Sequence, residues 1–376
     1  MKNTDFDIIC LSHLKWETTL FQRPQQIMTQ LSQSHRIIYV ASCKTKEFFL
    51  NIIKGNIREC WGKHNENLFY INIPFIPFTK YSKRLQKFSF FFSAKISEYL
   101  SKKFEFKNIY LWLYYPKYPE DLSSLKYQKL IYDCMDLFKG FKSSSEDIQI
   151  DENKLIKKAD IVFTGGKTLQ HAKEGINPKT YCFPSGVEYE HFQKATLEET
   201  RIPDELQKIN KPILGYFGAV DERINFKLLN YICEQRPEWS IVLLGPVVGL
   251  NELPVNKPNF YYLGKKDYAE LPNYLKGFDV CLMPFVINEL TMHISPTKTP
   301  EYLAGGKPVV STEIPDVIED YSDIVKITSN RDDFIKMVEE CLENKTEDFH
   351  LKIKNKAETK SWKYIADEME KLIKDL

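Results

Sequence analysis

Short apolar runs alternate with longer amphipathic stretches along most of the 376-residue chain, and this alternation constrains the fold more than any other feature. It is typical of strands joined by helical crossovers in a parallel sheet. The pattern occurs twice, in two series separated by a polar segment. A chain of this length fits two domains of roughly 150 to 200 residues better than one core. The sequence therefore predicts an α/β protein with two Rossmann-like, doubly wound domains that face each other across a cleft.

The predicted strands are mostly near-continuous apolar runs, as expected for strands buried on both faces of a sheet. In the first series they are Phe6–Leu11, Arg36–Val40, Leu68–Ile73, Asn108–Leu113, Leu130–Tyr132, Ile161–Thr164 and Thr180–Phe183. In the second series they are Ile213–Phe217, Ser240–Leu244, Phe260–Leu263, Val280–Met283, Val309–Ser311 and Ile324–Ile327. We expect an N-terminal domain over residues 1–190, a linker over 191–211, a C-terminal domain over 212–347 and a helical tail over 348–376 that packs back on the first domain.

The charge balance and the cysteines restrict the partners and the compartment. The chain has 52 Lys and Arg against 51 Asp and Glu, so no overall field exists to hold a nucleic acid by charge alone. The eight cysteines lie far apart, without a C-x-x-C pair, which is typical of free thiols in a reducing compartment. No signal peptide and no run of ~20 apolar residues is evident. We expect a cytoplasmic protein with no nucleic-acid partner.

One predicted helix, Lys83–Lys102, carries an aromatic patch at Phe88–Phe92. The basic residues beside this patch are Lys80, Lys83, Arg84 and Lys87. The patch could contact the inner face of a membrane or a lipid carrier peripherally. The alternative is a half-buried helix with solvated lysines.

The most informative segment lies near the end of the second series. A polar loop with Pro296 and Thr297 opens a short predicted helix there. Such a helix presents free N–H groups to an anion, and Lys298 adds a full positive charge. Glu301, one turn further, can accept two ribose hydroxyls, so the segment has the groups that a nucleoside diphosphate requires. Alternatively, the prolines only start a helix in which Lys298 is solvated.

Glycines follow two strands of the same series. Gly218 follows the strand Ile213–Phe217 and precedes Arg223, while Gly245 and Pro246 follow the next strand. Glycine lets backbone N–H groups approach a phosphate, and an arginine adds a charge-assisted pair of hydrogen bonds. We expect these residues to bind the same ligand, although each glycine could serve only a turn.

Polar residues in the first series, His13, Arg23, Asp133 and Asp136, lie at or beyond predicted strand ends and are expected to face the cleft. An aspartate there could orient a hydroxyl group or act as a base, and a histidine could do either. Alternatively, Asp133 caps a turn and Arg23 starts a helix.

Several short motifs occur in a specific order over nearly the whole chain. They are Phe21–Gln26, Tyr132–Asp136, Phe183–Glu188, Gly215–Gly218, Leu244–Pro246, Leu263–Gly264, Asp279–Phe285 and Pro296–Val310. With them the sequence resembles the GT-B glycosyltransferases, close to family 4 (glycosyltransferase group 1) of bacterial polysaccharide-assembly enzymes. The resemblance implies a UDP- or GDP-type nucleotide sugar in the second domain and a saccharide or lipid-linked saccharide acceptor mainly in the first. It also implies a retaining transfer without a metal or other cofactor.

By that resemblance Glu301 would hold the donor ribose, and Lys298 with Arg223 would neutralise the diphosphate leaving group. Many family members carry a glutamate eight residues before the ribose glutamate, where this chain has His293. This departure leaves open how the donor sugar is held and whether the transfer retains configuration. Two alternatives also stay open, a nucleotide-sugar epimerase on the same fold and a non-catalytic nucleotide-sugar-binding subunit.

Overall fold

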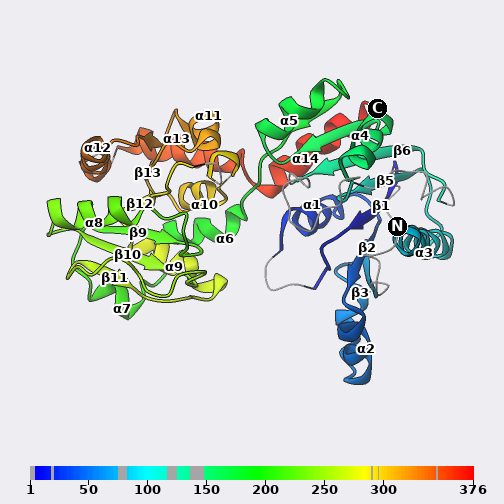
Figure 1. The fold of residues 1–376 in the computed structure, drawn as a ribbon, viewed down its shortest axis with the longest axis horizontal. Helices are drawn as coiled ribbons and strands as arrows, with labels where there is room; N and C mark the ends of the chain where they lie inside the picture. The colour runs from blue at the N-terminus through cyan, green and yellow to red at the C-terminus, as the bar shows by residue number, and fades with distance from the viewer. Residues whose placement is uncertain are drawn as a thin grey trace. The chain divides into compact units, whose positions relative to one another are not determined.

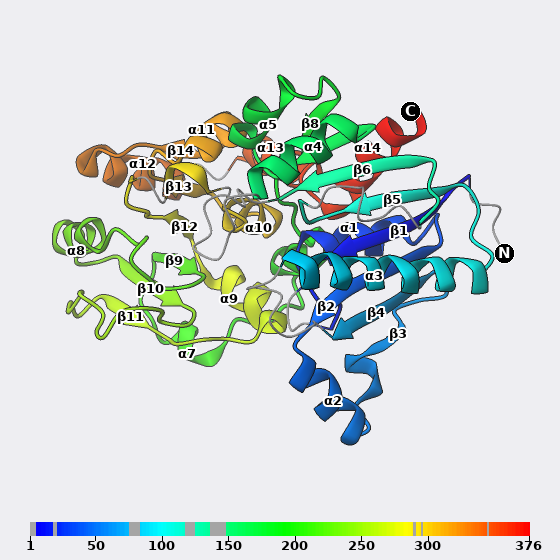
Figure 2. The same cartoon turned by 45° about the vertical axis from the view of Figure 1, so that its right-hand side comes forward.

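The computed structural model describes residues 5–17, 21–74, 83–116, 125–135, 148–288, 291–294, 296–343 and 346–376, without the side chains of 83, 84, 86, 87 and 293. The chain forms two compact units, Met1–Pro184 with Ile365–Leu376, and Ser185–Tyr364. Each unit is a largely parallel sheet with helices packed on it (Figures 1 and 2). The predicted α/β class with two Rossmann-like domains is therefore confirmed.

The sheet of the first unit has eight strands in the order β3-β4-β2-β1-β5-β6-β7-β8. They are β1 (Asp7–Ser12), β2 (Ile37–Cys43), β3 (Trp61–Lys63), β4 (Leu68–Pro74), β5 (Ile109–Leu113), β6 (Lys129–Cys134), β7 (Ile161–Thr164) and β8 (Thr180–Cys182). Strand β3 is antiparallel to β4, and the other neighbours are parallel. The helices are α1 (Arg23–Leu31), α2 (Thr45–Ile53), η1 (Ile57–Glu59), α3 (Lys83–Lys103), α4 (Ile148–Lys158) and α5 (Lys167–Glu174).

The central strands of this sheet are buried on both faces. Ile9 and Leu11 of β1 share one core with Ile38 and Val40 of β2 and with Leu100 of α3. The residues between them, which point to the other face, are also buried. This two-sided burial explains why the strands read as near-continuous apolar runs.

The sheet of the second unit has six parallel strands in the order β11-β10-β9-β12-β13-β14. They are β9 (Ile213–Phe217), β10 (Ser240–Leu244), β11 (Phe260–Tyr262), β12 (Val280–Met283), β13 (Val309–Ser311) and β14 (Lys326–Ile327). The helices of this half are α6 (Tyr189–Gln193), η5 (Lys194–Thr196), α7 (Asp204–Gln207), α8 (Phe226–Gln235), η6 (Tyr268–Glu270), α9 (Leu271–Gly277), η7 (Thr291–His293), α10 (Lys298–Ala304), α11 (Pro315–Tyr321), α12 (Arg331–Glu343) and α13 (Glu347–Glu358). Helix α14 (Trp362–Lys374) begins in this unit and continues in the first. No helix among the described residues has the length and apolar character needed to cross a membrane.

The two units divide at other positions than the expected domains. The segment expected as a linker forms η5 and α7, and its Ala195 and Leu206 are buried in the core of the second unit. Helix α13 lies in the second unit, whereas most of α14 lies in the first. There the Glu370 carboxylate is 2.9 Å from His35 Nε2. The chain therefore passes between the units twice.

Gly245, directly after β10, lies where a side chain has no room. Its φ is +138°, and an added Cβ would lie 1.7 Å from the Gly218 carbonyl oxygen. We expect Gly245→Ala to lower the free energy of unfolding by about 3 kcal/mol or more, because the clashing atom is backbone. Gly249→Ala is the control, with φ +71° and nothing within 4 Å, and should cost only about 1 kcal/mol. Urea unfolding of both variants checks this, and equal losses would contradict it.

Candidate functional site

The loops after β9 and β10 are joined by backbone hydrogen bonds at the carboxyl edge of the second sheet. Gly218 N donates to Leu244 O at 2.9 Å, and Val220 N donates to Pro246 O at 2.9 Å. The structure thus brings together Gly218, Gly245 and Pro246, three residues that the sequence predicts for the donor site. The N–H groups of Gly218 and Gly245 are both bonded to carbonyls within this unit. These glycines therefore shape the loops and do not offer their own N–H groups to a phosphate.

A buried side chain of helix α10, Tyr302, bonds to the end of β9. The Tyr302 hydroxyl accepts from Phe217 N at 3.0 Å and lies 3.2 Å from Phe217 O. The two rings meet edge to face, with centroids 4.7 Å apart. This contact fixes the first turns of α10 beside the loop that contains Gly218.

Lys298 and Glu301 form an ion pair on the first turn of α10. Lys298 Nζ lies 3.0 and 2.8 Å from the two Glu301 carboxylate oxygens, and 5.4 Å from the centroid of the Phe217 ring. Burial raises the pKa of Glu301, while Lys298 opposes that rise. With seven residues, α10 is a short helix, so most of the positive charge at this position comes from Lys298.

Arg223 is held in a second ion pair near β9. Its Nε lies 2.9 and 3.1 Å from the two Asp221 carboxylate oxygens, and its Nη2 lies 2.6 Å from one of them. Burial raises the pKa of Asp221, but the hydrogen bonds from Arg223 outweigh this effect. The pKa of Asp221 therefore lies below its usual value. The guanidinium also lies 5.7 Å from the Phe285 ring centroid. Both cations predicted to neutralise a diphosphate are thus paired with a carboxylate of the same unit.

Two further residues border Glu301, and the sequence did not single them out as ligands. Tyr268 is hydrogen-bonded to Glu188, and both Glu188 and Glu301 raise its pKa after the larger effect of burial. The ring of Tyr268 stacks on His191, with centroids 4.4 Å apart. Glu188 ends the quoted motif Phe183–Glu188, and this motif was the sequence signal that could have identified it. Tyr268 lies in none of the quoted motifs.

Two other predicted donor residues, and the predicted catalytic residue His293, lie shortly before α10. Pro296 is half-buried, and Thr297 is the exposed residue that precedes the helix. A hydrogen bond from Thr297 favours the charged form of Glu301. His293 ends η7, and its side chain is outside the described part of the structure. Its role therefore stays a prediction.

The structure buries two of the four residues predicted in the first unit, Arg23 and Asp133. Asp133 was expected to face the cleft, but its carboxylate is fully buried and accepts from Arg23 Nε at 2.9 Å. Arg23 Nη1 also donates to Phe183 O at 2.5 Å. Burial raises the pKa of Asp133, and Arg23 opposes this. The β6 strand alternates its side chains, so Asp133 points to the sheet face where α1 begins.

His13 and Asp136 complete the predicted set in the first unit. His13 directly follows β1 and is half-buried, with its ring centroid 6.1 Å from that of Tyr115. Asp136 lies outside the described residues. Of this predicted set, the structure therefore joins Arg23 with Asp133.

Comparisons with known proteins bear on both units. Residues 211–344 match the family described as Glycosyl transferases group 1. A relative from Bacillus subtilis (strain 168), TuaH, is provisionally named a teichuronic acid biosynthesis glycosyltransferase. It is 28% identical over 276 residues, which cover 67% of this chain and 68% of TuaH.

Solved structures resemble the whole chain in fold. Sucrose-phosphate synthase from Thermosynechococcus elongatus matches with a TM-score of 0.65 and 13% identity over 98% of both chains. Anabaena HepE, solved in complex with UDP and glucose, matches with a TM-score of 0.63 and 12% identity over 99% of this chain and 100% of HepE. Residues 211–344 are a glycosyl transferases group 1 domain, and the two sheets have the GT-B fold. The resemblance stated from the motifs is confirmed.

Substitution of Lys298 by methionine tests the ion pair of α10. In Lys298→Met the buried carboxylate of Glu301 loses its partner, so its pKa rises further above that of the unfolded chain. A raised native pKa means that stability falls as pH rises from the unfolded pKa through the native one. We expect a loss of about 2 kcal/mol near about pH 8 and a clearly smaller loss near about pH 5, where the carboxyl is protonated.

Urea unfolding at the two pH values measures both losses. The matched control is Lys298→Met combined with Glu301→Gln, which removes the unpaired charge and should restore most of the stability near about pH 8. Equal losses at both pH values, or no recovery in the double variant, would show that the pair does not control the charge of Glu301.

Proposed function

We propose that this chain transfers a glycosyl group from a UDP- or GDP-type nucleotide sugar to a saccharide or lipid-linked saccharide in cell-surface polysaccharide synthesis. One observation carries the proposal. Within a glycosyl transferases group 1 domain, Lys298 and Glu301 lie as an ion pair at the start of α10, beside Phe217 and Tyr268. A cation and a carboxylate at this spacing supply both groups that a nucleoside diphosphate needs.

The two ion pairs suggest how the donor binds. Lys298 and Arg223 are each neutralised by one carboxylate, Glu301 and Asp221 respectively. A diphosphate brings more negative charge than either carboxylate, so it competes for both cations. When Lys298 turns to the phosphates, both carboxylate oxygens of Glu301 become available to the ribose hydroxyls. The ligand thus replaces contacts within the protein, and no buried charge is left alone.

The proposed reaction relies on these cations and on no bound metal. As the bond between the anomeric carbon and the diphosphate breaks, negative charge develops on the leaving oxygen. Lys298 and Arg223 would stabilise that charge from preorganised positions. In line with the family resemblance, we propose that the anomeric configuration is retained. A role for His293 beside the donor sugar belongs to the same proposal.

The acceptor and the setting are proposed from the relatives. TuaH is named for the biosynthesis of teichuronic acid, a polysaccharide, and HepE was solved with UDP and glucose. A lipid-linked acceptor would bring the chain to the cytoplasmic face of a membrane. The aromatic patch of α3 fits this setting in part, because Phe88, Phe91 and Phe92 are exposed.

The donor site is tested by thermal unfolding with UDP, GDP, CMP, dTDP and NAD. A ligand about a hundredfold above its Kd adds about 2.7 kcal/mol to the apparent stability, equivalent to several degrees in Tm. We expect one of UDP and GDP to stabilise the wild type, while Glu301→Gln and Lys298→Met each lose most of that shift. Lys336→Met, at an exposed lysine of α12, is the matched control and should keep it.

Incubation of the corresponding nucleotide sugar with and without saccharide acceptors then separates the alternatives. Glycosyl transfer that needs the acceptor and persists in EDTA supports the proposal, and NMR of the product shows the anomeric configuration. Conversion of the donor sugar without any acceptor would favour the epimerase. Donor binding without turnover would favour the non-catalytic subunit, and stabilisation by NAD alone would reject the donor site.

A further inference from the structure

Residues 44–63 of the first unit leave the sheet after β2 and return to it through the edge strand β3, and we call this segment the 44–63 projection. Its helices α2 and η1 lie outside the sheet, and both ribbon views show α2 extending away from the strands (Figures 1 and 2). None of the nine residues of α2 is buried. Nothing in the proposed transfer chemistry accounts for such a helix.

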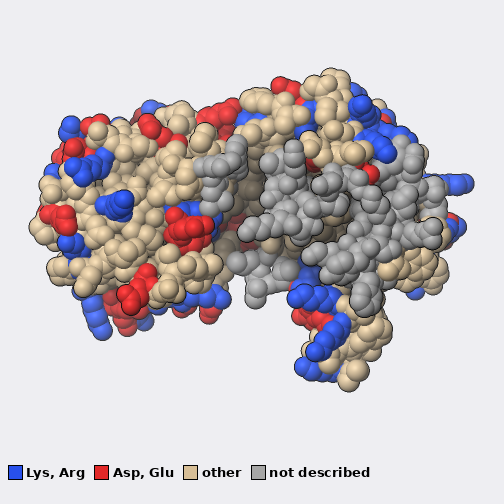
Figure 3. Space-filling model, in the orientation of Figure 1, with Lys and Arg blue, Asp and Glu red and all other residues tan. Residues whose placement is uncertain are grey.

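Large apolar side chains are exposed over this projection. They are Phe49, Leu50, Ile52, Ile53, Ile57 and Trp61, with Ile53 80% and Phe49 55% exposed. Single exposed apolar residues are ordinary, but a cluster of this kind marks an interaction surface. Figure 3 shows uncharged atoms at the tip of the projection, flanked by basic side chains.

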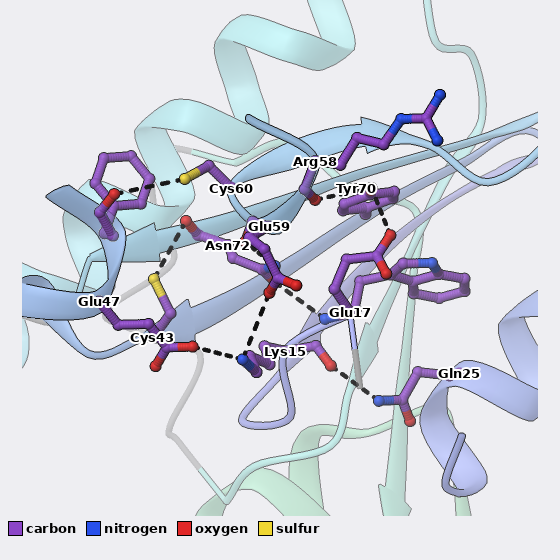
Figure 4. Close-up of polar contacts among 12 residues, drawn as sticks. Lys15, Glu17, Gln25, Cys43, Glu47, Arg58, Glu59, Cys60, Tyr70 and Asn72 are labelled. Carbon is purple, nitrogen blue, oxygen red and sulfur yellow. Dashed lines mark hydrogen bonds and ion pairs between the residues drawn. The ribbon is translucent and has the colours of Figure 1, made fainter. Parts of the chain in front are cut away.

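The cations and the carboxylates of the projection lie in different places. Five exposed cations, Lys44, Lys46, Lys54, Arg58 and Lys63, have no ion-pair partner in the part of the chain that the structure describes. The only two carboxylates of this segment, Glu47 and Glu59, lie 2.5 and 3.7 Å from Lys15 Nζ. Figure 4 shows both pointing toward Lys15, while Arg58 points away from them. The two acids thus gather around Lys15 at the base, while the five cations of the segment stay exposed.

The base of the projection is firmly attached to β4. Asn72 Nδ2 donates to Glu59 O at 2.9 Å, and the Tyr70 hydroxyl donates to Arg58 O at 2.9 Å (Figure 4). Cys60 Sγ lies 3.7 Å from Phe48 O and links the base to α2. These bonds hold the backbone of the projection in a defined place, so its exposed apolar and basic side chains form a built surface.

We propose that the 44–63 projection docks on an anionic lipid bilayer. The apolar side chains of α2 and η1 enter the interface, and the five cations meet the lipid phosphates, as in interfacial amphipathic helices. A second copy of this chain could cover the apolar side chains but would bring the same unpaired cations together, which repel. The inference identifies the surface with which the chain would contact the membrane in the proposed function. It does not rest on glycosyl transfer, because docking is measured without donor or acceptor.

The aromatic patch of α3 fits this role less well. Lys95 and Lys102 of α3 are both paired with Glu98, at 2.9 and 2.8 Å. Of the three α3 cations whose side chains are described, two are therefore engaged by an acid of the same helix, and Lys103 is exposed. The two surfaces can be compared directly, because each carries exposed phenylalanines.

Sedimentation of the full chain with vesicles tests the docking surface. We expect binding to phosphatidylcholine vesicles with about 30% phosphatidylglycerol, none to pure phosphatidylcholine, and release as salt rises from about 0.1 M to about 0.5 M. Combined change of Lys44, Lys46, Lys54 and Arg58 to Gln should weaken binding about tenfold or more. Phe49→Ser with Ile53→Ser should weaken it similarly.

Two matched controls test whether binding depends on where the changed residues lie or only on the charge and apolar side chains that are removed. Changing Lys336, Lys352, Lys354 and Lys371 to Gln removes the same charge from exposed sites elsewhere and should leave binding within about twofold. Phe88→Ser with Phe92→Ser on α3 should do the same. Equal loss in the lysine control, or loss only in the α3 variant, would overturn the proposal.

Trp61 gives a second readout that does not depend on variant stability. Of the five tryptophans, Trp61 is 38% exposed, while Trp16, Trp112, Trp239 and Trp362 are buried. Brominated lipids should quench the tryptophan emission of the wild type, and Trp61→Phe should lose that quenching but keep binding. Binding without quenching of Trp61 would overturn the proposal. So would self-association through the projection in the absence of vesicles.

Discussion

The hydrogen bonds of the Tyr302 hydroxyl are the contact on which the arrangement of the candidate donor site depends. This hydroxyl bonds both the N–H and the carbonyl group of Phe217, so it attaches α10 to the last residue of β9. The Phe217 ring lies under Lys298, and the next residue is Gly218, which joins the loop after β10. One fully buried phenol therefore links the helix that carries the cation and the carboxylate to the strand that leads into the glycine loop.

The charges around this contact are compensated in pairs. Glu301 is almost fully buried, and a carboxylate in that position is costly unless a cation and hydrogen bonds accompany it. Lys298 provides the cation for Glu301, and Asp221 provides the carboxylate that pairs with Arg223. In the proposed function, these two paired cations are the groups that meet the diphosphate. In the first unit, the buried pair of Arg23 and Asp133 follows the same rule without reaching solvent.

The central strands could be predicted from the sequence because burial on both faces leaves a near-continuous apolar run. The predicted bounds of β9, β10, β12 and β13 match the observed ones. Helix α2 was not predicted, because its apolar side chains pack against no core and its run resembles an ordinary loop next to a strand. The segment after residue 190 looked like a linker because only a few of its residues, such as Leu206, are buried.

The candidate site was predictable only where one short segment holds several ligands. Lys298 and Glu301 are three residues apart on one helix, so their pairing follows from helical geometry. The contact of Tyr268 with Glu188 and that of Arg23 with Asp133 join residues far apart in the chain. Such contacts depend on the tertiary fold, which spacing along the sequence does not determine.

A crystal structure of the chain with its bound nucleoside diphosphate tests the central claim most directly. The account predicts the diphosphate within hydrogen-bonding distance of Lys298 and Arg223, the ribose hydroxyls on Glu301, and Lys298 turned away from that carboxylate. A nucleotide bound elsewhere, with the Lys298–Glu301 and Arg223–Asp221 pairs intact, would contradict it.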